Sequence, residues 1–190
     1  MIRIFYVILV LGSLSAYSQK SGFKGGLNIG NEKATQGGNS ATATAKLSFM
    51  LGVYTEAKLS EQFFLSPELV YSIDGGKTEG FGDTFTDNFS YLSVPLMLKY
   101  YATEKFNLHV GPQLGFLLTA KVKSSGGTAD ITSSLKKTNF SMAFGGEGNL
   151  GSVNLGLRMI LGLTDIANDE VFGDVEYRLN TIQIYLAVPF

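Results

Sequence analysis

The last nine residues of the chain alternate between apolar and wetter positions. The apolar positions are the even-numbered ones, Ile182, Ile184, Leu186, Val188 and Phe190. This period of two is that of a β-strand with one apolar face and one wetter face. A final strand that ends on an aromatic residue is unusual for a soluble protein. It is typical of an outer-membrane barrel, in which lipid covers the apolar face.

The same alternation predicts eight strands. They are expected at about 22–32, 47–59, 63–73, 89–101, 105–120, 139–149, 152–163 and 178–190. Three connections are tight, at 60–62, at 102–104 and around Leu150-Gly151, and four are long, at about 33–46, 74–88, 121–138 and 164–177. Short and long connections alternate strictly, as in an up-and-down barrel with short periplasmic turns and long outer loops. The predicted fold is therefore all-β, an eight-stranded antiparallel up-and-down transmembrane β-barrel.

One parity of each predicted strand is apolar, and the size of the barrel decides where that face points. In the seventh strand, Leu155, Leu157 and Met159 oppose Gly156 and Arg158. The interior of an eight-stranded barrel is just wide enough for side chains to fill it. Five or six large apolar side chains from every strand would overfill this space. We therefore expect the apolar face to point outward into lipid.

Aromatic residues of the apolar parity fall near both ends of the predicted strands. Those expected at the periplasmic ends are Phe23, Phe63, Tyr100, Phe106 and Phe190, and those expected at the outer ends are Phe49, Tyr71 and Phe140. Two aromatic girdles that flank an apolar band are the usual anchors of a barrel at the two membrane interfaces.

The wetter parity predicts a polar interior. Its members are Lys24, Asn28, Glu56, Lys58, Glu68, Lys99, His109, Gln113, Glu147, Arg158, Gln183 and Tyr185. Four cations face three acids in this set. Because unpaired buried charge is costly, we expect these groups to pair with one another and to plug the interior. A narrow pore remains an alternative, although a wide diffusion channel needs about twice as many strands.

Composition adds an export signal and excludes several classes of site. Residues 1–18 combine Arg3, an apolar run from Ile4 to Leu11 and small residues before Gln19, which predicts a signal peptide followed by a barrel domain at 19–190. The chain has no cysteine, so disulfides, thiolate metal sites and cysteine nucleophiles are excluded. The formal net charge of −1 gives no indication of nucleic-acid binding. The long loops are polar and rich in glycine and serine, and such composition is not expected to form a core of its own.

Five segments resemble a known family. They are Gly25-Gly26-Leu27-Asn28, Leu65-Ser66-Pro67-Glu68-Leu69-Val70-Tyr71, Tyr91-Leu92-Ser93-Val94-Pro95-Leu96, Leu108-His109-Val110-Gly111-Pro112-Gln113-Leu114-Gly115 and Gly162-Leu163-Thr164-Asp165-Ile166. They are similar to segments of the PorT-type outer-membrane β-barrel proteins of Bacteroidetes, over about residues 22–190. The founding member of that family is implicated in secretion and maturation of exported proteins, and most relatives have no assigned role. The resemblance implies the fold and no catalytic residues. Phe190 also resembles the C-terminal aromatic signal that the barrel-assembly machinery reads, and Pro189 is a departure beside it.

Few residues are candidates for chemistry. His109 is the single histidine, but its position in the middle of a strand on the interior parity favours a structural role over lipid-modifying catalysis. The loop at 164–177 carries Asp165, Asp169, Glu170, Asp174 and Glu176 without a basic residue. It is either a solvated loop or a divalent-cation site, and its spacing matches no EF-hand. Lysines at 121, 123, 136 and 137 could pair with this loop or contact anionic lipid headgroups. No catalytic residue, cofactor site or metal site is predicted.

Three functions remain as hypotheses. The leading one is an integral outer-membrane barrel, exported by its signal peptide, with a plugged polar interior and four long surface loops in a structural or surface-interaction role. The expected partners are outer-membrane lipid and lipopolysaccharide, the barrel-assembly machinery acting through the strand that ends at Phe190, and unknown surface or secretion partners. The alternatives are a secreted soluble barrel that binds a lipophilic ligand, like a lipocalin, and a lipid-modifying enzyme that depends on His109.

Overall fold

The computed structural model describes residues 18–80 and 82–190. Apart from Ser18, the first residue of β1, the predicted signal peptide lies outside the described residues. Eight long strands form the wall of the molecule: β1 (Ser18–Gln36), β3 (Thr44–Lys58), β4 (Phe63–Asp74), β6 (Asp83–Thr103), β7 (Phe106–Ser124), β9 (Thr138–Asn149), β10 (Asn154–Gly162) and β11 (Glu176–Pro189). The short elements are β2 (Asn39–Thr42), β5 (Gly76–Gly80), β8 (Gly127–Asp130), the 3-10 helix η2 (Thr132–Ser134) and the helix α2 (Asp169–Phe172).

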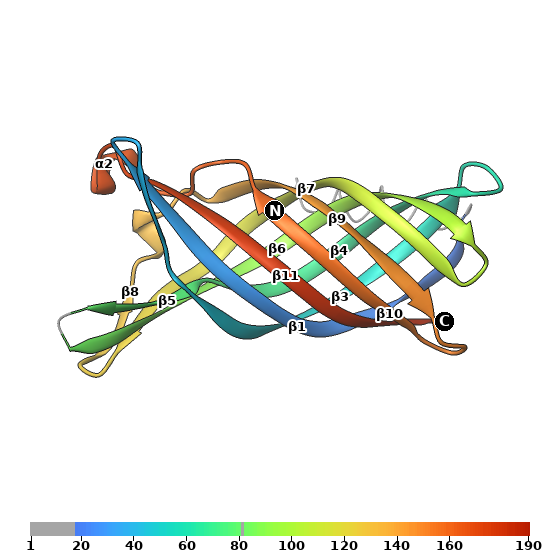
Figure 1. Ribbon diagram of the computed structural model, residues 1–190, viewed down its shortest axis with the longest axis horizontal. Coiled ribbons are helices and arrows are strands. Elements are labelled where there is room, and N and C mark those ends of the chain that lie inside the picture. The colour runs from blue at the N-terminus through green and yellow to red at the C-terminus, as the bar shows by residue number, and fades with distance from the viewer. Residues whose placement is uncertain (1–17, 81) are drawn as a thin grey trace.

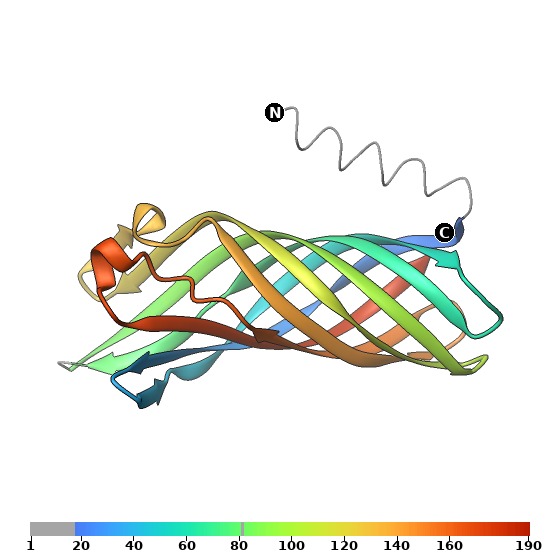
Figure 2. The same cartoon turned by 90° about the horizontal axis from the view of Figure 1, so that it is seen from above.

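The long strands close into a ring. Each pairs antiparallel with its neighbours along the chain, and β1 pairs with both β3 and β11, so the sheet has no free edge among these eight strands. All of the long strands are tilted against the long axis of the molecule (Figures 1 and 2). The predicted eight-stranded up-and-down barrel is thus confirmed.

The two ends of the barrel differ. The turns β3–β4, β6–β7 and β9–β10 gather at one end together with the C-terminus (Figure 1). We call this the tight-turn end. The short strands β5 and β8 and the helix α2 lie at the opposite end, here called the loop end (Figure 1).

The orientation of the two faces is as predicted. Leu157 leaves 58% of its surface exposed, whereas its neighbour Arg158 leaves 1%. Leu155 and Ile184 also point outward, and Glu56 is buried inside. This arrangement is the reverse of a soluble barrel such as a lipocalin, in which the apolar face is enclosed.

Aromatic side chains of neighbouring strands pair on the outer face. The rings of Phe23 and Phe190 have centroids 5.0 Å apart, and those of Phe63 and Tyr100 are 5.2 Å apart, both near the tight-turn end. Phe49 forms a looser pair, at 6.1 Å, with Tyr71 farther along the barrel. The predicted outward placement of these residues is confirmed.

The loops are more ordered than the sequence predicts. Three of them continue the barrel strands as hairpins, which explains why β1, β6 and β7 outrun their predicted ends. The hairpin β1–β2 turns on Gly37 and Gly38, whose φ angles are 56° and 84°. A two-residue type I′ turn requires positive φ at both positions.

A second correction is that the loops do form a core. Leu135 and Ile166, from the third and fourth loops, are buried among residues of the strand ends. We name this group the loop cap, and its members are Phe89, Tyr91, Leu117, Ala120, Ile131, Leu135, Ile166, Phe172, Tyr177 and Leu179.

Candidate functional site

Six charged side chains pair with one another inside the tight-turn half of the barrel. We call them the ion cluster: Lys24, Glu56, Glu68, Lys99, Glu147 and Arg158. Alternation of side chains along the strands brings them to one place, because each lies on the inward parity of its strand. Their side chains are at most 2% exposed.

Glu147 is at the centre of the ion cluster. It accepts hydrogen bonds from Lys24 Nζ at 3.0 Å and from Lys99 Nζ at 2.7 Å. The hydroxyl of Tyr185 donates to it at 2.7 Å, and the amide of Asn107 donates at 3.3 Å. A carboxylate in low-polarity surroundings is stable only when several donors satisfy its oxygens, and this one has four.

Glu68 and Glu56 extend the cluster on either side. The guanidinium of Arg158 grips Glu68 with two hydrogen bonds of 2.9 Å, and Lys24 donates to the same carboxylate at 2.8 Å. On the other side, Lys99 reaches Glu56 at 2.7 Å. The two-pronged arginine contact fixes geometry as well as charge.

The charges of the ion cluster balance, which corrects one prediction. Lys58 lies on the inward parity of β3 but is exposed, because it is the last residue of the strand and lies past the enclosed interior. Without it, Lys24, Lys99 and Arg158 face Glu56, Glu68 and Glu147. Three cations therefore face three acids. The predicted mutual pairing is confirmed for these six residues.

His109 is part of the wall of this cluster. It is 3% exposed, and its Nε2 accepts a hydrogen bond from Nε of Arg158 at 3.3 Å. A guanidinium can only donate, so Nδ1 carries the proton and faces Oδ1 of Asn107 at 3.3 Å. Both ring nitrogens are thus engaged, and the ring is neutral. The predicted interior position of His109 is confirmed.

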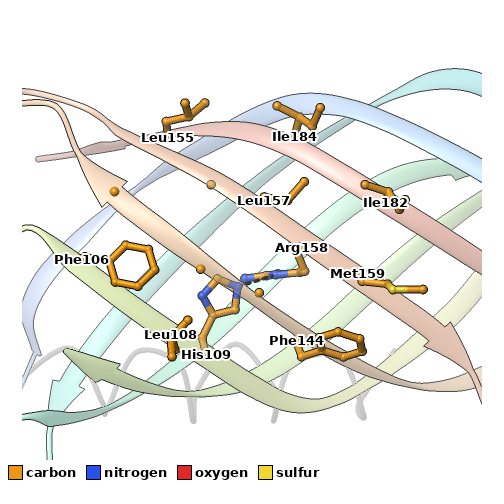
Figure 3. A pocket seen from close by; sticks show the side chains of 14 residues that line it. Phe106, Leu108, His109, Phe144, Leu155, Leu157, Arg158, Met159, Ile182 and Ile184 are labelled. Atoms are coloured by element: carbon orange, nitrogen blue, oxygen red, sulfur yellow. Dashed lines mark hydrogen bonds between the residues drawn. The ribbon is translucent and has the colours of Figure 1, made fainter. Parts of the chain in front are cut away.

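The wall is thin where glycines cover His109 and Arg158. Gly145 and Gly156 face inward here, and a Cβ on Gly145 would strike the main-chain oxygen of Leu157. Outside, a groove runs past Phe106, Phe144 and Leu157, and it is almost wholly apolar (Figure 3). Glycine thus lets the large interior side chains fit while the surface stays apolar.

Two acids at the loop end have no such cluster around them. We call Glu32 of β1 and Asp87 of β6 the mouth acids. They lie beyond the apolar belt, because the outward residues at this level are polar, with Asn31 and Lys33 following Ile29 along β1. Glu32 is 7% exposed, and its Oε1 has no hydrogen-bond partner in the described structure.

The mouth acids lie within hydrogen-bonding reach of one another. Burial, followed by repulsion from Asp87, raises the pKa of Glu32 to about 8. Burial also raises the pKa of Asp87. The nearest cation, Lys46, gives its hydrogen bonds to the main-chain oxygens of Asp74 and Asp87, at 3.3 and 2.7 Å. The two acids therefore share one proton near neutral pH.

The third and fourth loops are joined by charge and by backbone. Lys136 contacts Asp165 at 2.7 Å, and Leu135 forms an antiparallel bridge with Ala167. Partial burial opposes ionisation, but the Lys136 ammonium and main-chain N–H groups hold the pKa of Asp165 below its ordinary value. The predicted pairing between these loops is thus found at Asp165. Within residues 18–80 and 82–190, no group of three or more carboxylate or histidine side chains could hold a metal ion.

Comparison with known proteins agrees with this geometry. Residues 17–168 match the family described as the outer membrane protein beta-barrel domain. The chain belongs to this family. It is accordingly an integral protein of the outer membrane. No curated protein matches the sequence. None of the helices in the described ranges is long and apolar enough to cross a membrane.

Solved structures share the fold. Ail, the attachment invasion locus protein of Yersinia pestis, is 15% identical, with a TM-score of 0.53 over 90% of this chain and 98% of that one. Neisserial surface protein A is 11% identical, with a TM-score of 0.50 over 88% of this chain and 97% of that one. At these identities the likeness concerns the fold alone.

Sequence reasoning missed the mouth acids and the loop cap. Glu32 stood at the edge of a predicted strand, and Asp87 stood in a predicted loop. The signal that could have found Glu32 was its parity, which continues the inward series of Lys24 and Asn28. Nothing comparable indicates that Ile131 and Ile166 come together over Asp87.

Proposed function

We propose that this protein is a non-enzymatic, non-conducting barrel whose long loops serve as a surface-interaction site. The observation that carries the closed interior is the ion cluster together with the small spaces on either side of it. The cavity beside Tyr101 and Glu147 measures about 20 Å³, and the one beside Asp74 and Tyr91 about 10 Å³. Each is about the size of one water molecule, so neither offers a solute a path.

Planar-bilayer recording tests the closed interior. The refolded wild-type barrel is expected to give no large, stable conductance steps. A double variant, Arg158→Ala with Glu68→Ala, removes a mutually neutralising pair and opens space, so it serves as the matched positive control. Stable steps from the wild type would overturn this part of the proposal.

The surface role rests on the loops and on the fold shared with Ail. Ail has also been solved in complex with sucrose octasulfate, a heparin analogue, with a TM-score of 0.50 to this chain. That ligand is a property of Ail, and for this chain we propose only that the loops meet partners outside the cell. Surface labelling of loop lysines on intact cells tests this placement. Label at Lys77 and none at Lys105, in a tight turn, is the expected result, and the reverse pattern would contradict it.

Lipopolysaccharide is the partner for which the outer rim offers the clearest chemistry. Lys33 and Arg178 lie directly opposite one another across β1 and β11, and both are exposed. Like charges in this position repel, and the carboxylate of Glu176, 3.0 Å from Nη2 of Arg178, offsets one of the two charges. The two cations lie just beyond Ile29 and Ile182 of the apolar belt, where lipid phosphates are expected. Added lipopolysaccharide should raise the melting temperature of the wild type more than that of Lys33→Gln, with Lys77→Gln as the control.

Two narrower statements of the proposal concern the family branch and export. The five segments quoted above support membership of the PorT-type branch. An alignment with PorT-type proteins that places gaps within these segments would remove that support. We propose that residues 1–18 are cleaved, so that sequencing of the mature protein begins at Gln19. A mature chain that retains Arg3 would contradict cleavage.

The final strand is proposed as the assembly signal. Phe190→Ala should lower the amount of barrel in the outer membrane of cells without preventing refolding in detergent. Phe23→Ala removes the other ring of the same aromatic pair and is the matched control. Equal losses from both variants would show that the pair stabilises the barrel and is not read as a signal.

The absence of enzymatic activity is tested through His109. His109→Gln keeps a side chain that can hydrogen-bond and should leave the lipid profile of cells unchanged. A specific loss of a lipid modification, with the barrel still folded, would contradict the proposal. Replacement of Glu170 by Gln is the surface control.

A further inference from the structure

The loop end contains a pocket that the barrel role does not use. It has a volume of about 170 Å³. Its lining combines the two mouth acids with seven apolar or aromatic residues: Phe89, Val122, Ile131, Leu135, Ile166, Phe172 and Tyr177. Two carboxyl groups are therefore part of an otherwise apolar lining. We call this pocket the mouth pocket.

The carboxyl group of Glu32 is the feature of this pocket that favours ligand binding. Glu32 is 7% exposed and lines the pocket. The main chain of Gly76 and the carboxyl of Asp87 hydrogen-bond with the Glu32 carboxyl, but its Oε1 accepts no hydrogen bond. A buried acceptor without a donor is costly, and more so when it carries charge. A ligand that has an N–H donor and a positive charge would hydrogen-bond to Glu32 and would offset the negative charge of Glu32 and Asp87.

The chemistry of the walls narrows the class of cation. A calcium ion takes six to eight oxygen ligands, and the described residues provide no group of three acids here. Phe89, Phe172 and Tyr177 instead bring aromatic rings to the lining, and an aromatic ring attracts an organic cation over its face and packs against hydrocarbon. A volume of about 170 Å³ suits a small molecule better than a peptide or a sugar chain.

We propose that the mouth pocket binds a small organic ammonium ion, with its N–H groups toward Glu32 and Asp87 and its hydrocarbon against the loop cap. The residues Ile131, Phe172 and Tyr177 at the rim of the pocket are only partly buried, so the pocket is reached from the loop end. Below about pH 8 the ligand enters in exchange for the proton that the mouth acids share, and one proton is released for each cation bound; above that pH the proton has already left and fewer are released.

Several other groups act on the mouth acids and set the pH range. Acidic or basic groups that face them or their neighbours are Lys46 on β3, Asp74 on β4, Tyr91 on β6, Lys123 on β7 and Tyr177 on β11. Because the pKa of Glu32 is about 8, the pair holds its proton below that pH, and the affinity for a cation falls as the pH falls.

Calorimetric titration of the refolded barrel with 2-phenylethylammonium tests the proposal. An alkylammonium stays charged at about pH 8.5, because its pKa is like the value of about 10.4 for lysine. We expect saturable binding at about pH 8.5 that weakens at least about tenfold at about pH 6. The neutral isostere 2-phenylethanol should bind far more weakly. Equal binding of the alcohol, no binding of the ammonium ion, or the same affinity at both pH values would overturn the proposal.

Two variants locate the site. Glu32→Gln should abolish the pH dependence and lower the affinity for the ammonium ion by at least about tenfold, the equivalent of about 1.4 kcal/mol. Glu79→Gln changes an exposed acid at the same end of the barrel and should bind like the wild type. Heat-modified migration on gels verifies that both variants are folded. Unchanged binding by a folded Glu32→Gln variant contradicts the proposed site.

Discussion

The two ends of the barrel interior handle buried charge in opposite ways. At the tight-turn end, Glu147 has four donors, and three cations balance three acids. At the loop end, Glu32 has an oxygen without a donor, and the nearest cation, Lys46, bonds to main-chain oxygens. The first arrangement pairs every charge of the ion cluster, as the proposed plug requires. The second is left with an acid pair that a proton or a ligand must complete.

The largest effect should follow from breaking the plug. Glu147→Gln leaves Lys24 and Lys99 short of a buried counter-charge. Removal of one partner from a buried ion pair costs about 3–5 kcal/mol, and we expect a loss of this size in the free energy of unfolding. Denaturant titration in detergent or lipid measures it. Glu104→Gln, in the exposed turn β6–β7, is the control, and a loss under about 1 kcal/mol at Glu147 would refute the structural plug.

A smaller loss should follow from crowding the plug without removing charge. A Cβ on Gly156 would lie against the ring of Tyr185, so Gly156→Ala must push aside the hydroxyl that donates to Glu147. Overpacking of this kind costs about 1–3 kcal/mol. Gly148→Ala, where a Cβ meets nothing within 4 Å, is the matched control. Equal stability of the two variants would show that the ring has room to move.

The loop end should respond to pH instead. The pKa of Glu32 rises from an ordinary 4.5 to about 8 on folding, so the folded protein holds the proton more tightly than the unfolded chain. The contribution to stability is fully present below about pH 4.5 and is lost as the pH rises toward about 8. We expect the wild type to lose on the order of 1–2 kcal/mol across this range, with a slope of at most about 1.4 kcal/mol per pH unit.

Glu32→Gln separates this effect from other titrations. The variant carries no ionisable group at this position, so its stability should vary less with pH than that of the wild type. Unfolding curves at about pH 5 and about pH 8.5 make the comparison. If the two proteins lose stability in parallel, the mouth acids are not the source.

The smallest effect should come from the loop ion pair. Lys136 and Asp165 are both partly exposed, and such pairs contribute about 0–1 kcal/mol. Lys136→Gln should therefore change stability little, and added salt should reduce the difference further. Proteolysis of the fourth loop is the more sensitive measurement, with Lys137→Gln as the control. A loss above about 2 kcal/mol would mean that the pair organises the loop cap.

Sequence patterns predict the barrel well because apolar and polar side chains alternate along each whole strand, so every residue contributes to the pattern. Leu157 and Arg158 are assigned to opposite faces by parity alone, and size then decides which face meets lipid. The same rule fails at Lys58, because parity says where a side chain points but not where the enclosed interior ends. Pairing of Lys24 with both Glu68 and Glu147 follows from register and closure, which the sequence does not reveal.

The loop end is poorly predicted for a different physical reason. Ile131, Leu135 and Ile166 are isolated apolar residues in polar segments, so each segment taken alone resembles a solvated loop. Folding of the sheet brings the third and fourth loops together over Phe89, because they connect strands that are neighbours in the sheet. The mouth acids share this origin, because Glu32 and Asp87 become neighbours only across the ring.

The central claim is that lipid covers the outward parity while the inward parity is enclosed. The chain has no tryptophan, so a single introduced tryptophan is an unambiguous reporter. In bilayers of brominated lipid, Leu157→Trp should be strongly quenched, and Tyr185→Trp, on the inward face of β11, should be quenched far less. Strong quenching at position 185 with little at position 157 would contradict the account.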